Sequence, residues 1–182
     1  FNYNFIKIFL IYFTSTILVI FLYSLVDLRL FDAFNLAFTS ISSGGFIPGD
    51  NISNIIRNNL QIFIFSITLL FPIFNFFLLH DIITRKFSLK NYQEDLHLGS
   101  LIVLLTLFFY FFIIPKEGFA NVLFAITSSI STSGITTYSS NFDLSLFFIL
   151  LTIVGGSLIS TSSGFKYTRI YILLKISYQE IY

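Results

Sequence analysis

The chain has 182 residues, of which 55% are hydrophobic and only 10% carry a charge. Soluble domains carry about 25% charged residues, so this composition excludes a disordered chain and argues against a water-soluble globule. The formal net charge of +1 excludes the basic surface that nucleic-acid binding requires. The absence of Cys excludes disulfides and thiolate sites, and two His residues are too few for a histidine metal cluster. Because the chain begins at Phe1 and contains no Met, we expect it to be a piece of a longer protein.

Four segments are apolar enough to cross a bilayer, which takes about 20 helical residues. They are residues 5–26, residues 60–80, residues 98–114, and a segment that starts at 144, breaks after 154 and resumes at 170–176. Inside a bilayer the backbone must satisfy its own hydrogen bonds, so we expect these segments to be helices. Pro72 is expected to kink the second of them, with neighbouring groups bonding the freed carbonyl.

Two shorter apolar segments, residues 30–40 and 117–130, lie between these spans, and each runs into a stretch of Ser, Thr and Gly. Neither is long enough to cross a bilayer, so we expect each to form a re-entrant half-helix followed by extended backbone. The order span, half-helix, Ser/Thr–Gly turn, span therefore occurs twice. Ser43 and Gly44 recur 90 residues later as Ser133 and Gly134. Internal duplication is common in transporters and places the functional site where the repeats meet.

Basic residues predict the orientation, because they are enriched on the cytoplasmic side. With both Gly turns outside, the inner side holds Lys7, Arg85, Lys86, Lys90, Lys166, Arg169 and Lys175, and the outer side holds Arg29, Arg57 and Lys116. The acidic residues Asp32, Asp50, Glu117 and Asp143 then flank the two turns on the outer side, and Asp81, Glu94, Asp95 and Glu180 lie inside. Each outer acid is either a cation attractor or an ordinary surface charge.

The two turns have the composition that a dehydrated cation requires. Backbone carbonyls can replace the hydration shell of an ion if several point at one axis, and Gly permits the backbone angles that this needs. The carboxyl ends of the half-helices add partial negative charge, and residues 41–46 and 131–137 contain no charged side chain. The alternative is that each is merely a surface turn; the duplication favours an ion filter.

The interruption of the last span is a second signal. Residues 144–154 cover only about 16 Å of helix at about 1.5 Å per residue, so residues 155–166 should lie at membrane depth. Irregular backbone is tolerated there only when it is buried in protein or lines a water-filled cavity. We expect a flexible segment that gates the path below the turns. The alternative is a span that ends near Val154 and is followed by a cytoplasmic loop.

These motifs resemble those of the Trk/Ktr/HKT superfamily of potassium transporters, in which four span–pore-helix–span repeats form one pore. Residues 41–46, Ile-Ser-Ser-Gly-Gly-Phe, resemble the second filter of that family, usually close to Val-Ser-Thr-Gly-Gly-Phe, and residues 131–137 resemble its third. Residues 155–166 resemble the gating loop of the third repeat. The matching loop positions are Gly155, Gly156, Ser157, Ser160, Thr161, Gly164 and Lys166, and Arg169 follows where the family has an Arg.

The resemblance implies an all-α membrane protein with two span–pore-helix–span repeats of a four-repeat, potassium-channel-like pore. Residues 1–80 would be the second repeat, 81–97 a cytoplasmic linker, 98–176 the third repeat with a broken last span, and 177–182 a cytoplasmic tail. Carbonyls of the filter residues would bind potassium. These residues are Ser42, Ser43, Gly44, Gly45 and Phe46 in one turn, and Ser131, Thr132, Ser133, Gly134 and Ile135 in the other.

The implied activity is potassium uptake across the cell membrane by a multi-pass protein, with K⁺ as the transported ion. Proton or sodium symport is one form of coupling that the resemblance allows. The resemblance implies neither a cofactor nor an enzymatic step. The implied partners are membrane lipid, the missing repeats from the same or another chain, a second copy in a homodimer, and a cytoplasmic nucleotide-binding regulatory subunit. Nucleic acid is not among them.

Departures from the family pattern keep alternatives open. Leu158 and Ile159 replace small residues of the loop, and Ser162 and Ser163 replace glycines, so the loop should be stiffer than usual. The alternatives are a non-functional fragment, a sodium-permeable relative, and a membrane-embedded enzyme or assembly subunit whose turns bind lipid headgroups. The glycines at 44 and 134 argue against the sodium-permeable relative. An enzyme should carry a clustered acid, base or metal set, and the sequence has none.

Overall fold

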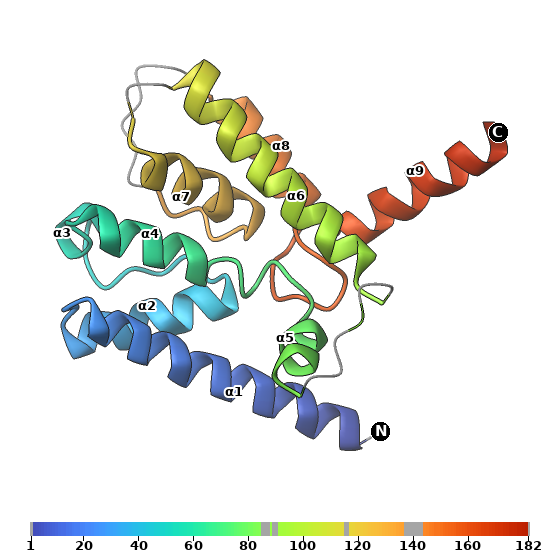
Figure 1. Cartoon of the computed structure of the whole chain (residues 1–182). Coiled ribbons are helices and arrows are strands. Elements are labelled where there is room, and N and C mark those ends of the chain that lie inside the picture. The colour runs from blue at the N-terminus through green and yellow to red at the C-terminus, as the bar shows by residue number, and fades with distance from the viewer. Residues whose placement is uncertain (1, 85–87, 89–90, 115–116, 137–143, 182) are drawn as a thin grey trace.

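The computed structural model describes residues 2–84, 88, 91–114, 117–136 and 144–181 of the chain. Within these ranges every regular element is a helix (Figure 1), so the all-α prediction is confirmed. The α-helices are α1 (Asn2–Leu25), α2 (Leu30–Ser42), α3 (Ile52–Ile55), α4 (Asn59–Thr68), α5 (Phe76–Ile83), α6 (Gln93–Phe108), α7 (Phe119–Ile130), α8 (Ser145–Val154) and α9 (Tyr167–Ile181). A π-helical turn, η1 (Phe109–Ile113), continues α6.

Two of these helices are long and apolar enough to cross a membrane. They are Phe5–Leu25 within α1 and Gln93–Ile113, formed by α6 and η1. Only 22% of the residues in either apolar window are buried, whereas the core helix of a soluble protein is mostly buried. The predicted spans at 5–26 and 98–114 are therefore confirmed as helices, the second of which begins five residues earlier than expected at Gln93.

The expectation of one kinked helix over residues 60–80 is wrong. Helix α4 ends at Thr68 and α5 begins only at Phe76, with turns between them. Pro72 supplies no N–H, and the carbonyls that a helix would have used are bonded elsewhere. The N–H of Ser157 donates to the Ile73 carbonyl at 2.8 Å. The break is therefore stabilised by the interrupted last span, a partner far away in sequence.

The predicted interruption of the last span is present. Helix α8 ends at Val154, α9 starts at Tyr167, and residues 155–166 between them form an irregular loop. In Figure 1 this loop lies beside the segment that joins α4 to α5, and α9 projects away from the other helices. Helix α9 continues through residue 177, where the tail was expected to start, to Ile181.

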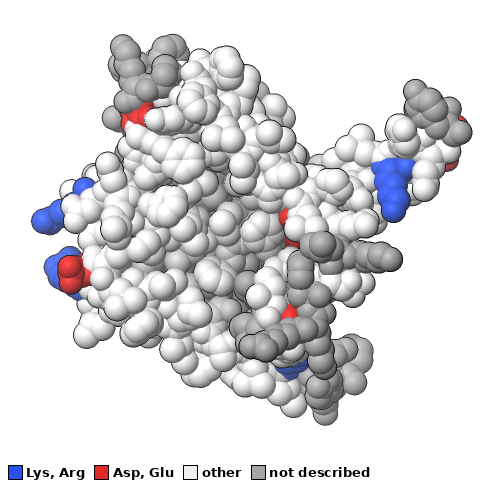
Figure 2. Space-filling model, viewed as in Figure 1, with Lys and Arg blue, Asp and Glu red and all other residues white. Residues whose placement is uncertain are grey.

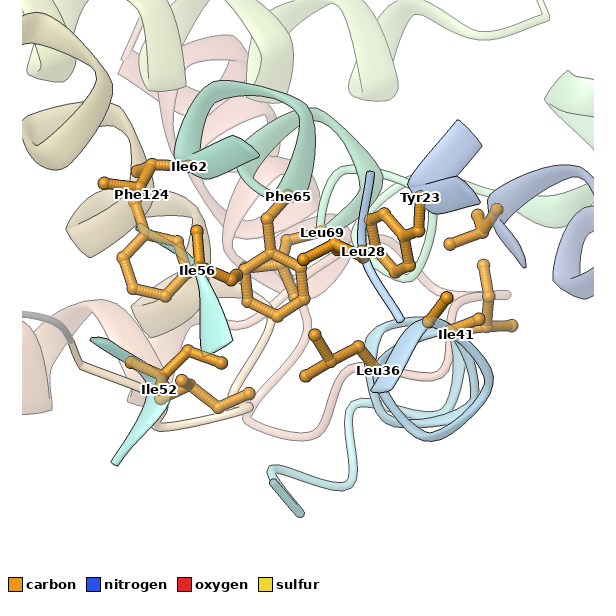
Figure 3. Packing of buried hydrophobic residues seen from close by; sticks show 14 residues of the cluster. Tyr23, Leu28, Leu36, Ile41, Ile52, Ile56, Ile62, Phe65, Leu69 and Phe124 are labelled. Carbon is orange, nitrogen blue, oxygen red and sulfur yellow. The ribbon is translucent and has the colours of Figure 1, made fainter. Parts of the chain in front are cut away.

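An aromatic cluster joins the two halves of the chain. The Phe65 ring of α4 lies 5.8 Å from the Tyr23 ring of α1 and 5.4 Å from the Phe124 ring of α7 (Figure 3). All three side chains are buried, and the Tyr23 hydroxyl and the Thr68 hydroxyl are hydrogen-bonded at 2.5 Å. Such pairs stabilise beyond their buried area by about 0.5–1.5 kcal/mol. Helix α4 of the first half therefore holds the half-helix α7 of the second in place.

Charged side chains are few on the face shown in Figure 2. They lie at the end of the molecule that holds the α1–α2 connection and α3, at the upper left edge, at the place where α5, α6 and α9 meet, and on α9, and most of the remaining surface is uncharged. This is the distribution that a bilayer selects. Arg85, Lys86, Lys90, Lys116 and Asp143, which entered the predicted orientation, lie outside the described residues.

A small ionisable cluster joins α5 to the start of α6. The Tyr92 hydroxyl donates to Asp81 at 2.6 Å, and His80 contacts the same carboxylate at 3.1 Å. These bonds, that of Tyr92 first, lower the pKa of Asp81, and burial together with the Asp81 carboxylate raises the pKa of Tyr92 to about 12. The cluster thus stabilises the α5–α6 junction at neutral pH.

We expect its contribution to depend on pH in a defined way. A lowered pKa contributes stability that is present above the unfolded value, near 4 for Asp, and is lost as the pH falls through the folded value. The raised pKa of Tyr92 contributes stability that is lost as the pH rises from about 10 to about 12. Tyr92→Phe should cost about 1 kcal/mol near neutral pH and remove the alkaline loss. Thermal unfolding of the purified protein against pH tests this, and a Tyr92→Phe curve that parallels the parent at alkaline pH would contradict it.

Candidate functional site

The two predicted turns begin in the same way at the ends of their half-helices. Helix α2 ends at Ser42 and α7 at Ile130, and the residues that leave them have positive φ, +56° at Ser43 and +62° at Thr132. Two residues later each turn has a glycine with positive φ, +72° at Gly45 and +66° at Gly134. Glycine adopts this conformation without the steric cost that a side chain adds. Both turns therefore share one backbone path.

Their hydrogen bonds fix the register between the two repeats at 89 residues. The Thr39 hydroxyl donates to the Phe46 carbonyl, and 89 residues later the Ser128 hydroxyl donates to the Ile135 carbonyl at 2.6 Å. The N–H of Gly44 donates to the Thr39 carbonyl just as the N–H of Ser133 donates to that of Ser128.

The predicted offset of 90 residues is therefore wrong by one, and Gly45, not Gly44, is equivalent to Gly134. The Ser–Gly dipeptide suggested the wrong register because Gly44 and Gly45 are adjacent. Only the backbone distinguishes them, since Gly45 has positive φ and Gly44 does not.

The two turns lie against each other. A Cβ atom added to Gly45 would be 2.2 Å from the Ser133 carbonyl oxygen, which is closer than real atoms approach. The carbonyls of Gly44, Gly45, Ser133 and Gly134 accept no hydrogen bond from any residue that the structure describes. Those of Phe46 and Ile135, in contrast, are bonded to their own half-helices. The Ser133 carbonyl of one turn thus lies against Gly45 of the other, and the four carbonyls have no partner among the described residues.

One side of each turn is packed and the other is open. In the second turn Ser131, Ser133 and Ile135 are buried, and the hydroxyls of Ser131 and Ser133 form a hydrogen-bond network with each other and with Ser128. In the first turn the Phe46 side chain is 82% exposed. Each turn is therefore supported from behind by its half-helix, and its other side is free to face further protein.

The irregular loop, residues 155–166, contacts the ends of both half-helix units. The Thr161 hydroxyl donates to the Ile41 carbonyl at 2.7 Å, at the end of α2. The N–H of Ser163 donates to the Thr132 hydroxyl at 3.0 Å, in the second turn. The loop therefore lies directly at the carboxyl ends of α2 and α7.

Close backbone contacts and a serine hold the loop in shape. Gly155 has φ of +65°, and a Cβ there would be 2.1 Å from the Ser163 carbonyl oxygen. The Ser162 hydroxyl, at a position where the family has glycine, accepts the N–H of Gly156 at 2.9 Å. The loop is thus cross-linked by a bond that glycine could not make, consistent with the expected stiffness.

The Lys166 side chain binds the loop in which it lies. Its ammonium donates to the Ser160 carbonyl at 3.1 Å, to the Ser160 hydroxyl at 3.2 Å, and to the Ser162 carbonyl. Arg169 lies over the Phe165 ring, 5.8 Å from its centroid. The Lys166 side chain therefore neutralises oxygens that the loop's irregular backbone leaves without partners.

Sequence reasoning gave no role in the site to two residues at the break of the second span. The Asn75 side chain accepts the Phe77 N–H at 2.9 Å and caps α5. Asp95 of α6 accepts the N–H of Asn75 at 3.2 Å. An Asn that precedes an apolar helix is a capping signal. The sequence shows that signal at Asn75 only if the helix is taken to break at Pro72 and to start again after Asn75.

The acids expected near the turns are differently engaged. Asp32 is buried and paired with Arg29 at 2.7 Å, so it is not a free cation attractor. Asp50 is exposed. No group of three or more His, Asp or Glu side chains that could hold a metal ion occurs among the described residues.

The fold and the site define an all-α membrane protein built around paired half-helix and turn units. No protein-family model matches the chain. A curated relative from Methanocaldococcus jannaschii, described as an uncharacterized cation transporter, is 31% identical over 175 residues, which cover 94% of this chain and 36% of the relative.

The crystal structure of the potassium transporter TrkH from Vibrio parahaemolyticus superposes with a TM-score of 0.81 at 23% identity. It covers 96% of this chain, which corresponds to 40% of the TrkH chain. The chain therefore has the fold of part of a TrkH-type protein, and the resemblance predicted from its motifs is confirmed. Both similar proteins are described as transporters. The chain spans less than half the length of either.

Proposed function

We propose that the chain forms half of a potassium-selective path across the cell membrane, with Gly44, Gly45, Ser133 and Gly134 supplying carbonyls to the ion. The observation that carries this proposal is the contact between two equivalent turns whose carbonyls have no other described partner. An unpaired carbonyl in a low-dielectric region costs free energy unless something binds it. A dehydrated alkali cation satisfies such oxygens.

The half-helices strengthen this site electrostatically. Helices α2 and α7 end at the turns, so the partial negative charge of each carboxyl end lies beside the carbonyls. The Ser42, Ser43 and Thr132 carbonyls lie next along the same two turns and complete the proposed filter, whereas the Ser131 carbonyl accepts the Thr132 hydroxyl at 2.6 Å and would have to exchange that bond for the ion. Phe46 and Ile135 then act by fixing the backbone, since their carbonyls bond to their own helices.

Two turns cannot surround an ion, so the proposal requires further repeats. We place residues 1–80 as the second and 98–176 as the third of four repeats, joined by a linker at 81–97. The open side of the first turn at Phe46, and the 36% and 40% shares of the two similar proteins, support this. The first and fourth repeats come from the same or another chain, and a homodimer with a cytoplasmic regulatory subunit is the expected assembly.

We further propose that the loop at 155–166 is the gate. Its bonds to Ile41 and Thr132, at the carboxyl ends of both half-helices, support this proposal, as does the positive charge of the Lys166 ammonium within the loop. The transported ion is the substrate, and its passage makes or breaks no covalent bond. Glycine at both equivalent positions, 45 and 134, favours potassium over the sodium-permeable alternative.

Rubidium uptake by cells that lack their own potassium uptake tests the proposal. The full-length protein that contains this chain is expressed with Gly134→Asp, which adds a side chain and a charge where φ is +66°. Gly118→Asp is the matched control, because Gly118 caps α7 at an exposed position and has nothing within 4 Å of an added Cβ.

We expect Gly134→Asp to abolish uptake and Gly118→Asp to keep it. Uptake that Gly134→Asp leaves at the parental level would contradict the filter assignment. No uptake by the unmodified full-length protein, present in the membrane at normal amounts, would favour a non-functional remnant instead.

A further inference from the structure

A buried carboxyl group lies where the two interrupted spans meet. Asp95, in the first turn of α6, is 2% exposed. Its Oδ1 accepts the N–H of Asn75 at the start of α5. Its Oδ2 has no hydrogen-bond partner, and neither has the fully buried hydroxyl of Ser157, which faces the same carboxyl from the loop at 155–166. Two unsatisfied polar groups thus oppose each other across a junction of three segments.

No cation neutralises this carboxyl within the described part of the chain, where the ion pairs are Arg29–Asp32 and His80–Asp81. The titratable groups around it are Glu94 on the same helix and Tyr92 just before it, and the loop contributes Ser157. His97, two residues further along α6, stacks on Tyr171 of α9 with the ring centroids 5.3 Å apart. From α5 the group that reaches the carboxyl is the Asn75 backbone.

Two physical effects therefore oppose each other at Asp95. Burial without a counter-ion disfavours the carboxylate, and the adjoining cavity of about 470 Å³ is lined mostly by apolar side chains. The amino end of α5, whose Asn75 N–H points at the carboxyl, favours the carboxylate through its partial positive charge. The protonated and ionised forms of Asp95 are consequently closer to each other in free energy than they would be if only one of these effects acted on the carboxyl.

The two forms differ in what they require of Ser157. A protonated Oδ2 donates its hydrogen to the Ser157 hydroxyl oxygen, which satisfies both groups and keeps the junction dry. A carboxylate needs several donors, and Ser157 supplies at most one, so the charge draws water into the junction. Because the N–H of Ser157 also bonds the Ile73 carbonyl in the break of the second span, opening here loosens the loop.

We propose that Asp95 is a proton-binding site whose neutral form holds the loop at 155–166 against α5 and α6 and whose ionised form releases it. The consequence for transport rests on the proposed function, in which this loop is the gate. In that case protons on the Asp95 side lower the flux, and their removal raises it.

The absence of Cys from the chain makes the loop directly measurable. Leu158→Cys, 52% exposed in the loop, reports on its opening, and Ser177→Cys, exposed on α9 beyond the span, corrects for the effect of pH on thiol reactivity. Both are placed separately in the full-length protein, with any cysteine outside this chain replaced. The ratio of their modification rates by a methanethiosulfonate reagent is measured from about pH 5.5 to about pH 8.5.

We expect the ratio to rise at least about threefold across this range in the parent. Asp95→Asn, neutral and of the same shape, should keep it low and independent of pH, whereas the matched control Glu94→Gln should keep the parental rise. Ser157→Ala, which leaves the carboxyl but removes its partner, should give a high ratio already at low pH. A parental ratio that is flat, or a rise that persists in Asp95→Asn, would overturn the proposal.

Rubidium uptake by the same variants separates this proposal from the transport function. A pH-dependent ratio that Asp95→Asn abolishes, in a protein that takes up no rubidium, supports the proton site and contradicts the transport proposal. Conversely, if Gly134→Asp abolishes rubidium uptake but the ratio of modification rates does not depend on pH, the transport proposal is supported and the proton site is contradicted.

Discussion

Gly45→Ala is expected to abolish rubidium uptake, whereas Gly44→Ala should only reduce it. Gly45 has φ of +72°, which costs a non-glycine residue about 1–2 kcal/mol. The added methyl group would also lie 2.2 Å from the Ser133 carbonyl oxygen, so the two turns would have to separate. At Gly44, φ is not positive and the nearest atom is the movable Ser42 hydroxyl at 3.0 Å. We therefore expect at least a tenfold difference in uptake, about 1.4 kcal/mol.

The comparison tests the 89-residue register as well as the filter. Both variants must be present in the membrane in parental amounts, since a loss of protein would imitate a loss of function. Equal losses in the two variants would contradict the equivalence of Gly45 with Gly134. A greater loss in Gly44→Ala would restore the register that the Ser–Gly dipeptide suggested.

Lys166→Met should raise the rate of uptake. Methionine keeps the length of the side chain but removes the ammonium that bonds Ser160 and Ser162 within the loop. A hydrogen bond to a charged group contributes about 1.5–3 kcal/mol, so losing even one should shift the population of the closed loop about tenfold or more. Initial rates of rubidium uptake at equal protein amounts measure the change.

Lys175→Met is the matched control, since Lys175 is exposed on α9, outside the loop. It should leave the rate at the parental value. Deletion of residues 158–163 should act in the same direction as Lys166→Met by shortening the obstruction. If both changes left the rate unaltered or lowered it, the loop would stabilise the fold and would not gate the path.

Much of the fold follows from the sequence because hydrophobic length is a strong signal in a membrane protein. The long apolar runs predicted α1 and α6, and the short runs before the Ser/Thr–Gly stretches predicted α2 and α7. The double glycine at 155–156 predicted the interruption between α8 and α9, because glycines weaken a helix and residues 144–154 are too few to cross.

The unpredicted features depend on partners that are distant in sequence. Pro72 alone indicates a kink, and the full break between α4 and α5 needs the N–H groups of Ser157 and Ser162 to bond the Ile73 and Pro72 carbonyls. The same holds for Lys166, whose role as a loop ligand depends on the loop folding back on it. Asp95 looks like an ordinary charge at a helix start until α5 and the loop cover it.

The most direct measurement of the central claim is to locate the ion. The full-length protein that contains this chain is crystallised with thallium or rubidium, and anomalous scattering gives the cation positions. We predict a peak in direct contact with the carbonyl oxygens of Gly44, Gly45, Ser133 and Gly134. Cations found only elsewhere along the path, with these carbonyls bonded to protein or facing lipid, would contradict the account.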